Sequence, residues 1–116
     1  MDKGDIERIR HIKLNCEDIY NSIERFGNSF DVFSGDVDFK KSVSMSIMQV
    51  GELSGGLTEK FRKATRDQIP WKLIKSMRNH FVHGYTTMDE LEIWETATKD
   101  IPHLLSFCNR VIAENT

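Results

Sequence analysis

Residues 5–26 read DIERIRHIKLNCEDIYNSIERF, and the spacing of their apolar side chains decides the fold. Those side chains recur at alternating intervals of three and four residues, at Ile9, Ile12, Cys16, Ile19, Ile23 and Phe26. An α-helix turns once in about 3.6 residues, so this spacing places all of them in one stripe. The stretch predicts a long amphipathic helix that ends at Gly27-Asn28-Ser29.

The same spacing predicts a second long helix over residues 38–65. It follows a turn-like stretch at residues 34–38, in which Asp36 or Asp38 can cap the helix. Three glycines lie inside the pattern, although glycine is a poor helix former. We interpret them as a close helix–helix contact or a kink, at Gly51, Gly55 and Gly56.

Two further helices follow in the second half of the chain. Pro70 fits the first turn of a third helix, which is predicted to end at Gly84. Thr87 and Glu90 have the spacing of a capping box, with Thr87 as the N-cap of a fourth helix. Pro102 is predicted to kink or split that helix near Asp100, because proline lacks the amide hydrogen that a helix interior needs.

The sequence contains no strand-type alternation and no repeat. We predict an all-α fold, a four- to five-helix up-and-down bundle that forms a single domain over residues 1–116. With 39% hydrophobic and 29% charged residues, the composition fits a few long amphipathic helices, or a chain that hides apolar surface by dimerising.

Charge and cysteine content narrow the range of functions. The net charge of −2 argues against a general cationic coat for nucleic acid, although a local basic cleft remains compatible with RNA. Basic residues do cluster between positions 60 and 78, which fits either a solvated helix face or such a cleft.

Cys16 and Cys108 lack CxxC spacing and are interpreted as core residues. Without an apolar leader or membrane span, a cytoplasmic location is expected.

Chemistry-bearing residues concentrate at positions 78–85, which read RNHFVHGY. His11 and His103 have no such neighbours and are interpreted as surface residues. Metal-protease, dinucleotide and P-loop signatures are missing from the sequence. One explanation of the segment is structural, since basic side chains near a helix C-terminus stabilise its last carbonyls.

The alternative explanation is RNA cleavage without a metal or cofactor. A neutral His can accept the proton of an RNA 2′-hydroxyl, and Arg can hold the phosphate. Arg78 and His83 point about 140° apart on an ideal helix, so the two side chains of a single copy do not meet in one cleft. Two copies across a two-fold axis can form a shared cleft. A second His, from the partner or His80, can protonate the leaving oxygen, giving a cyclic phosphate.

At these residues the chain resembles the HEPN superfamily, and within it the HepT-like toxins of toxin–antitoxin pairs. The motif R-x4-H-x-Y is matched by Arg78, His83 and Tyr85, and the polar residue after the Arg by Asn79. Four further segments resemble the family, namely Val50-Gly51-Glu52, Ile69-Pro70-Trp71, the lead-in at Met77, and Trp94 with Asp100-Ile101-Pro102.

This resemblance implies a homodimeric, metal-independent endoribonuclease that dimerises through the motif-bearing helices. By the same resemblance Arg78 and His83 are catalytic, Asn79 supports them, and His80 is a possible auxiliary residue. The implied partner is a minimal nucleotidyltransferase antitoxin that transfers AMP from ATP to Tyr85. A non-catalytic HEPN module that binds a nucleotide or such a transferase is the alternative.

Overall fold

A computed structural model describes residues 1–82 and 89–116, and for residues 80–82 it describes the backbone alone. The described residues form helices and connecting turns without a strand, which confirms the all-α prediction. Among them, no helix is both long and apolar enough to cross a membrane. In chain order the elements are α1 (Lys3–Phe26), α2 (Phe30–Gly35), α3 (Val37–Gly55), α4 (Glu59–Thr65), α5 (Trp71–Val82), α6 (Glu90–Glu95), a π-helix (Thr96–Asp100) and α7 (Ile101–Glu114).

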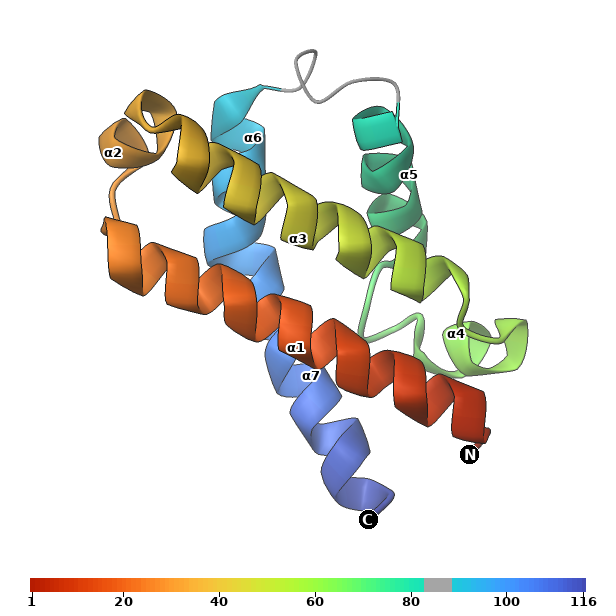
Figure 1. The fold of residues 1–116 in the computed structure, drawn as a ribbon. Coiled ribbons are helices and arrows are strands. Elements are labelled where there is room, and N and C mark those ends of the chain that lie inside the picture. The colour runs from red at the N-terminus through yellow and green to blue at the C-terminus, as the bar shows by residue number, and fades with distance from the viewer. Residues whose placement is uncertain (83–88) are drawn as a thin grey trace.

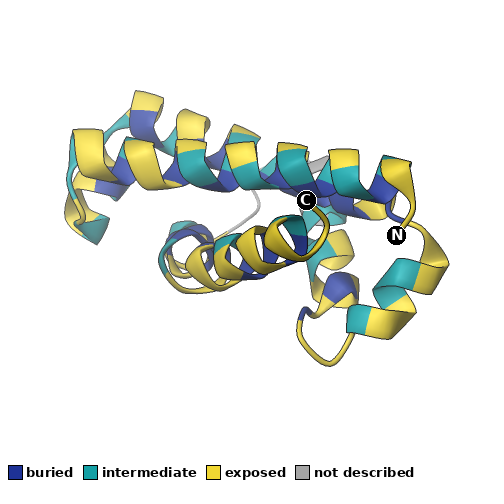
Figure 2. Cartoon of the chain, turned by 90° about the horizontal axis from the view of Figure 1, so that it is seen from below, coloured by how far each residue is buried: buried dark blue, intermediate teal, exposed yellow. Residues whose placement is uncertain are grey.

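The helices pack as two layers. α1 and α3 run antiparallel beside each other and form the first layer (Figure 1). The second layer lies across it and contains α5 and the continuous column of α6, the π-helix and α7 (Figure 1). α1 contacts α7 and α3 contacts α5, so both helices of the first layer reach the second. Seen from below, buried residues gather where the two layers meet (Figure 2).

The predicted stripe of α1 is the centre of the core. Ile9, Ile12, Cys16 and Ile19 are fully buried. α1 ends as predicted at Gly27, whose φ of 117° lies in a region that favours glycine. The spacing of the apolar residues therefore predicted the buried face of this helix, and Gly27 predicted its end.

Two aromatic clusters join the short helices to the long ones. Phe33 of α2 contacts the Trp94 ring of α6 and the Phe39 ring of α3, with centroid distances of 5.1 and 5.2 Å. At the other end of the core, α4, α5 and α7 each supply one aromatic ring, and the ring centroids are 5.9 to 6.2 Å apart. Such contacts add to the apolar area that each ring buries, so α2 and α4 are held by packing.

The single helix predicted over residues 38–65 is wrong, because α3 ends at Gly55 and α4 follows as a separate helix. Gly56 caps α3, and Thr58 caps α4 by accepting a bond from the Phe61 amide. The buried Asp5 carboxylate accepts bonds from the Thr58 amide and hydroxyl, at 2.8 and 2.6 Å. This long-range contact with α1 fixes the break that the glycines permit.

The stretch before α3 is more helical than predicted. Phe30–Gly35 forms α2, with Ser29 as its N-cap, where the sequence predicted a turn-like region from residue 34 onward. The fully buried Phe33 explains this short helix, since packing stabilises a helix that would be marginal alone. Asp36 caps α3 as predicted, accepting a bond from the Phe39 amide.

The N-terminus of α6 also differs from the prediction. Asp89 is the N-cap and accepts a bond from the Leu91 amide, so Thr87, which lies outside the described residues, is not the cap. Glu90 does not complete a capping box but reaches across to α2 and α3. Its carboxylate accepts a bond from the Ser34 hydroxyl and pairs with Lys40 at 3.0 Å.

Pro102 disturbs its helix as predicted. The five residues before Ile101 form a π-helical segment, in which the Ile101 amide donates to the Thr96 carbonyl. A proline inside a helix leaves a carbonyl without its donor and crowds the preceding turn. The wider π-turn immediately before Pro102 accommodates the ring without ending the column.

Candidate active site

Arg78 lies on the face of α5 that packs against α3. A Cβ atom at Gly51 would lie 2.5 Å from the Arg78 Cβ and 3.4 Å from its Cα. No side chain fits at that distance, so the two helices approach this closely only because residue 51 is glycine. The contact confirms the close helix–helix approach predicted for Gly51 and fixes the base of the Arg78 side chain.

Two polar side chains hold the Arg78 guanidinium. Its Nε donates to the Glu52 Oε1 at 2.6 Å, and its Nη1 donates to the Asn79 Oδ1 at 3.1 Å. The Arg78 side chain is 36% exposed and that of Glu52 is 47% exposed. A guanidinium has more N–H groups than these two bonds use. Arg78 is thus anchored at its base and its head while remaining accessible to a phosphate.

Of the motif residues, the structure describes the side chains of Arg78 and Asn79. His83 and Tyr85 lie outside the described residues, as does the predicted cap at Gly84. His80 belongs to α5, and its side chain is likewise outside the described part of the chain. The structure therefore brings together Arg78 and Asn79, and the cleft shared with His83 stays a prediction.

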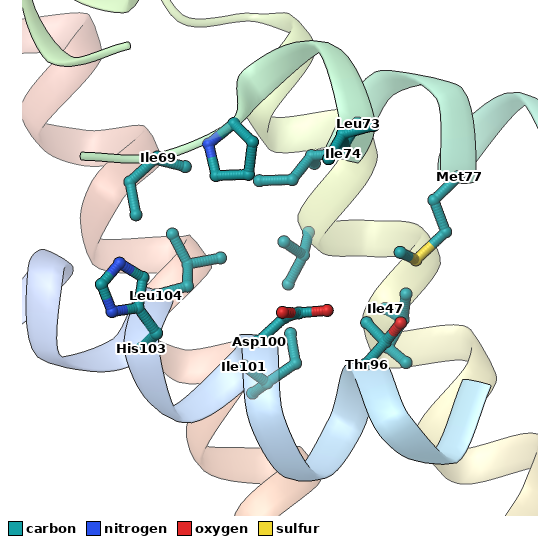
Figure 3. A pocket seen from close by; sticks show the side chains of 12 residues that line it. Ile47, Ile69, Leu73, Ile74, Met77, Thr96, Asp100, Ile101, His103 and Leu104 are labelled. Carbon is teal, nitrogen blue, oxygen red and sulfur yellow. The ribbon is translucent and has the colours of Figure 1, made fainter. Parts of the chain in front are cut away.

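A largely apolar groove lies between α5, α3 and the column formed by the π-helix and α7. It encloses a cavity of about 150 Å³. Figure 3 shows Thr96 and Asp100 of the π-helix facing Leu73, Ile74 and Met77 of α5. Met77, which lines the groove, directly precedes Arg78 in the chain.

The groove continues toward α6 with an acidic border. Glu92, Glu95 and Asp100 line this part together with Leu73 and Met77 of α5. Leu73 is 67% exposed, a large fraction for a leucine that borders an apolar groove. An apolar surface with a border of one charge is typical of a contact site rather than of a solvated face.

The other histidines are surface residues as predicted. His11 is exposed on α1, and the exposed His103 ring lies 3.1 Å from the Gln68 carbonyl oxygen. Cys16 and Cys108 are buried as free thiols, in agreement with the sequence. Burial raises the pKa of both thiols, that of Cys108 to about 12. Neither cysteine is available as a nucleophile in the folded chain.

The basic cluster does not form one helix face. Its members belong to α4, to the turn after it and to α5, and most are exposed, at Lys60, Arg62, Lys63, Arg66, Lys72, Lys75 and Arg78. Lys63 pairs with Glu59 on the same helix at 3.1 Å. Arg78 is distinct, because its partner Glu52 comes from another helix.

The sequence pattern did not predict the contact between Glu52 and Arg78. Glu52 was notable only as part of Val50-Gly51-Glu52, a segment that resembles HepT-like proteins. Helical spacing places Glu52 on the polar side of its helix and gives no information on its partner. The one available signal was its position next to Gly51, where a close contact was already predicted.

Known proteins are similar to this chain in sequence over most of its length. The family described as Ribonuclease HepT-like matches residues 16–111. A candidate RNase of Caldanaerobacter subterraneus subsp. tengcongensis is 32% identical over 96 residues, which cover 83% of each chain. A candidate RNase of Methanocaldococcus jannaschii is 27% identical, covering 90% of this chain and 94% of its own.

A candidate ribonuclease HepT of Thermococcus cleftensis is 29% identical over 100 residues, which cover 82% of this chain and 90% of that protein. No solved structure matches the chain. The family match spans most of the chain and includes the segment with Arg78, Asn79, His83 and Tyr85. This chain therefore belongs to the HepT-like ribonuclease family.

Proposed function

We propose that this protein is the toxin of a toxin–antitoxin system and acts as a metal-independent endoribonuclease in the cytoplasm. The observation that carries the proposal is the accessible Arg78 guanidinium, held by Glu52 and Asn79 in a chain of the HepT-like ribonuclease family. Arg78 and His83 are the proposed catalytic residues, with Asn79 in support.

In the proposed reaction the RNA supplies its own nucleophile. His83 accepts the proton of the 2′-hydroxyl as the 2′-oxygen attacks the neighbouring phosphorus. The bond from phosphorus to the 5′-oxygen breaks, and a protonated histidine, His80 or one from the partner, gives that oxygen a proton. Arg78 stabilises the charge that develops on the phosphate oxygens. The products are a 2′,3′-cyclic phosphate and a free 5′-hydroxyl.

The site is proposed to be completed by a second copy of the chain. On an ideal helix Arg78 and His83 would point about 140° apart, so we infer that a two-fold pair of α5 helices joins Arg from one copy with His from the other. The exposed Leu73 and the neighbouring groove give α5 an apolar contact surface. Lys72 and Lys75 flank Leu73, and their charge complements the acidic border of the groove in a second copy.

Neutralisation is proposed to occur at Tyr85, by analogy with the HepT-like toxins that the motif resembles. A cognate minimal nucleotidyltransferase would join the Tyr85 oxygen to the α-phosphorus of ATP and release pyrophosphate. The transferred AMP would bring a negative charge into the proposed cleft. That charge would compete with the RNA phosphate for the guanidinium.

Cleavage of a defined RNA oligonucleotide by purified protein tests the ribonuclease proposal. Wild-type protein should cut it in the presence of EDTA, leave a cyclic phosphate, and fail on an oligonucleotide with a 2′-deoxy residue at the cut position. His83→Ala should be inactive, while the control His11→Ala, at an exposed histidine of α1, should cut like wild type. Equal cleavage by His83→Ala would exclude the proposed base.

Expression in growing cells tests the toxin proposal separately. Wild type should arrest growth and degrade RNA, whereas His83→Ala should do neither. Co-expression of the nucleotidyltransferase should relieve the wild type but not Tyr85→Phe, if AMP transfer is the means of neutralisation. If purified wild type binds the transferase or a nucleotide but cuts no RNA, the non-catalytic HEPN module becomes the correct assignment.

A further inference from the structure

Glu52 lies outside the R-x4-H-x-Y motif yet makes the shortest described polar contact of the motif arginine. Its Oε1 is 2.6 Å from the Arg78 Nε, against 3.1 Å between the Arg78 Nη1 and the Asn79 Oδ1. Both contacts are hydrogen bonds, and the bond to Glu52 is also an ion pair. Both bonds are charge-assisted by the ionised guanidinium, and such bonds are shorter and stronger than bonds between neutral groups. Only the bond to Glu52 carries charge on both partners.

We propose that Glu52 is a positioning residue of the ribonuclease site, which orients the Arg78 guanidinium toward the scissile phosphate. This inference rests on the function proposed above. The Nε–H is taken by Glu52 and one Nη1–H by Asn79, so the N–H groups left are on the two terminal nitrogens. Those nitrogens form one edge of the guanidinium, which can grip two phosphate oxygens at once.

The backbone places Glu52 where it can do this. Gly51 directly precedes it and meets the Arg78 Cβ, so one turn of α3 contacts both the base and the head of the arginine side chain. The neighbouring Val50 and Ser54 are buried, and Ser54 donates to the Val50 carbonyl at 2.6 Å. Arg78 is therefore oriented by a helix that is anchored in the core.

The exposure of the pair distinguishes positioning from stabilisation. Ion pairs between solvent-accessible side chains contribute little to folding, because water screens them and ordering both side chains costs entropy. Loss of Glu52 should therefore leave the unfolding temperature near that of wild type. Without Glu52, however, the guanidinium can adopt several orientations, and misorientation of a catalytic group by about 1 Å can reduce the rate by a large factor.

The first test compares Glu52→Ala and Glu52→Gln with wild type in steady-state RNA cleavage. Glu52→Ala should lower kcat by roughly tenfold to a hundredfold. KM should change less, because the remaining basic residues still attract the RNA backbone. Glu52→Gln keeps an acceptor oxygen and should lose less activity than Glu52→Ala. Glu59→Ala is the matched control, since it breaks the exposed pair with Lys63 and should leave kcat unchanged.

The second test reads the arginine directly by NMR of its Nε–H group. The signal that disappears in Arg78→Lys identifies this group. In wild type it should be shifted by the bond to Glu52 and exchange slowly with water, and in Glu52→Ala it should lose both properties. Glu59→Ala should preserve them. This measurement needs no activity and also reports whether the Glu52 variants are folded.

The outcomes separate the two proposals. Wild type that cuts RNA, together with a Glu52→Ala variant of undiminished kcat or an unchanged Arg78 Nε–H signal, would overturn the positioning role alone. If the Glu52→Ala variant loses activity and its unfolding temperature also falls far below that of wild type, Glu52 has a structural role instead. Wild type that cuts no RNA would overturn the ribonuclease proposal, while the NMR comparison would still test whether Glu52 anchors Arg78.

Discussion

At the scale of single residues, the contact of Gly51 with Arg78 sets how closely α3 and α5 approach. The side chain of the candidate catalytic arginine leaves its helix at the point where the other helix has no side chain. Its head is then held by Glu52, the next residue of α3. The candidate site thus depends on two adjacent residues of a helix that lies outside the motif.

Gly51→Ala should destabilise the fold by roughly 1–3 kcal/mol, because the added Cβ would lie 2.5 Å from the Arg78 Cβ and must push the helices apart. Gly55→Ala is the matched control on the same helix. Its Cβ would meet nothing within 4 Å, and alanine is the better helix former, so its free energy of unfolding should be unchanged or slightly higher. Urea unfolding measures both, and equal stability of the two variants would contradict the described contact.

Cys16 and Cys108 should be unreactive in the folded protein. Burial raises the pKa of both thiols, so the reactive thiolate is scarce at neutral pH and no reagent reaches it. A thiol reagent at pH 7.5 should therefore modify neither residue in native protein and both residues in urea. Rapid modification of native protein would show that the core opens far more often than this packing allows.

At the scale of elements, the start of α6 is tied to the first layer by Glu90. Its pKa is lowered by the hydrogen bond from Ser34 first and by Lys40 second. The folded chain therefore holds this carboxylate charged at pH values where the unfolded chain would already take up a proton. The contribution to stability is present above the usual pKa of 4.5 and is lost as the pH falls through the lowered value.

Glu90→Gln should consequently be less stable than wild type at pH 7, and the difference should shrink as the pH falls below 4.5. Ser34→Ala removes the largest cause of the shift and should make the stability of the protein less dependent on acid pH. Thermal unfolding between pH 3 and pH 7 measures these differences. If the difference in stability between Glu90→Gln and wild type is constant over that range, it does not arise from the lowered pKa of Glu90.

At the scale of the whole molecule, the groove between the layers predicts how two copies meet. Leu73→Asp should convert a wild-type dimer into a monomer and abolish RNA cleavage, because it places a negative charge beside Glu92, Glu95 and Asp100. Since Leu73 is 67% exposed, the unfolding temperature of the monomer should change little beyond the effect of lost dimerisation. Analytical ultracentrifugation measures the oligomeric state.

Met45→Asp is the matched control for this experiment, since Met45 is 62% exposed on α3 and does not line the groove. It should remain dimeric and active. A dimeric Leu73→Asp variant would show that two copies meet on another surface, and a wild-type monomer that cuts RNA would remove the need for a composite site.

The sequence by itself determined the features that depend on neighbours along the chain. The apolar stripe of α1, its end at Gly27 and the distortion before Pro102 follow from helical period and backbone chemistry. The motif with Arg78 and His83 was likewise visible in the order of residues. These features could be predicted because each is decided within a few turns of helix.

Only the tertiary structure decided which faces meet. The break between α3 and α4 depends on Asp5 of α1. The start of α6 depends on its contacts with α2 and α3, and the orientation of Arg78 depends on Glu52. Helical spacing shows that a residue faces the core or the solvent, but several partners satisfy the same spacing. The choice among them is made when the two layers pack, because side-chain shape and glycine contacts admit one arrangement of the helices.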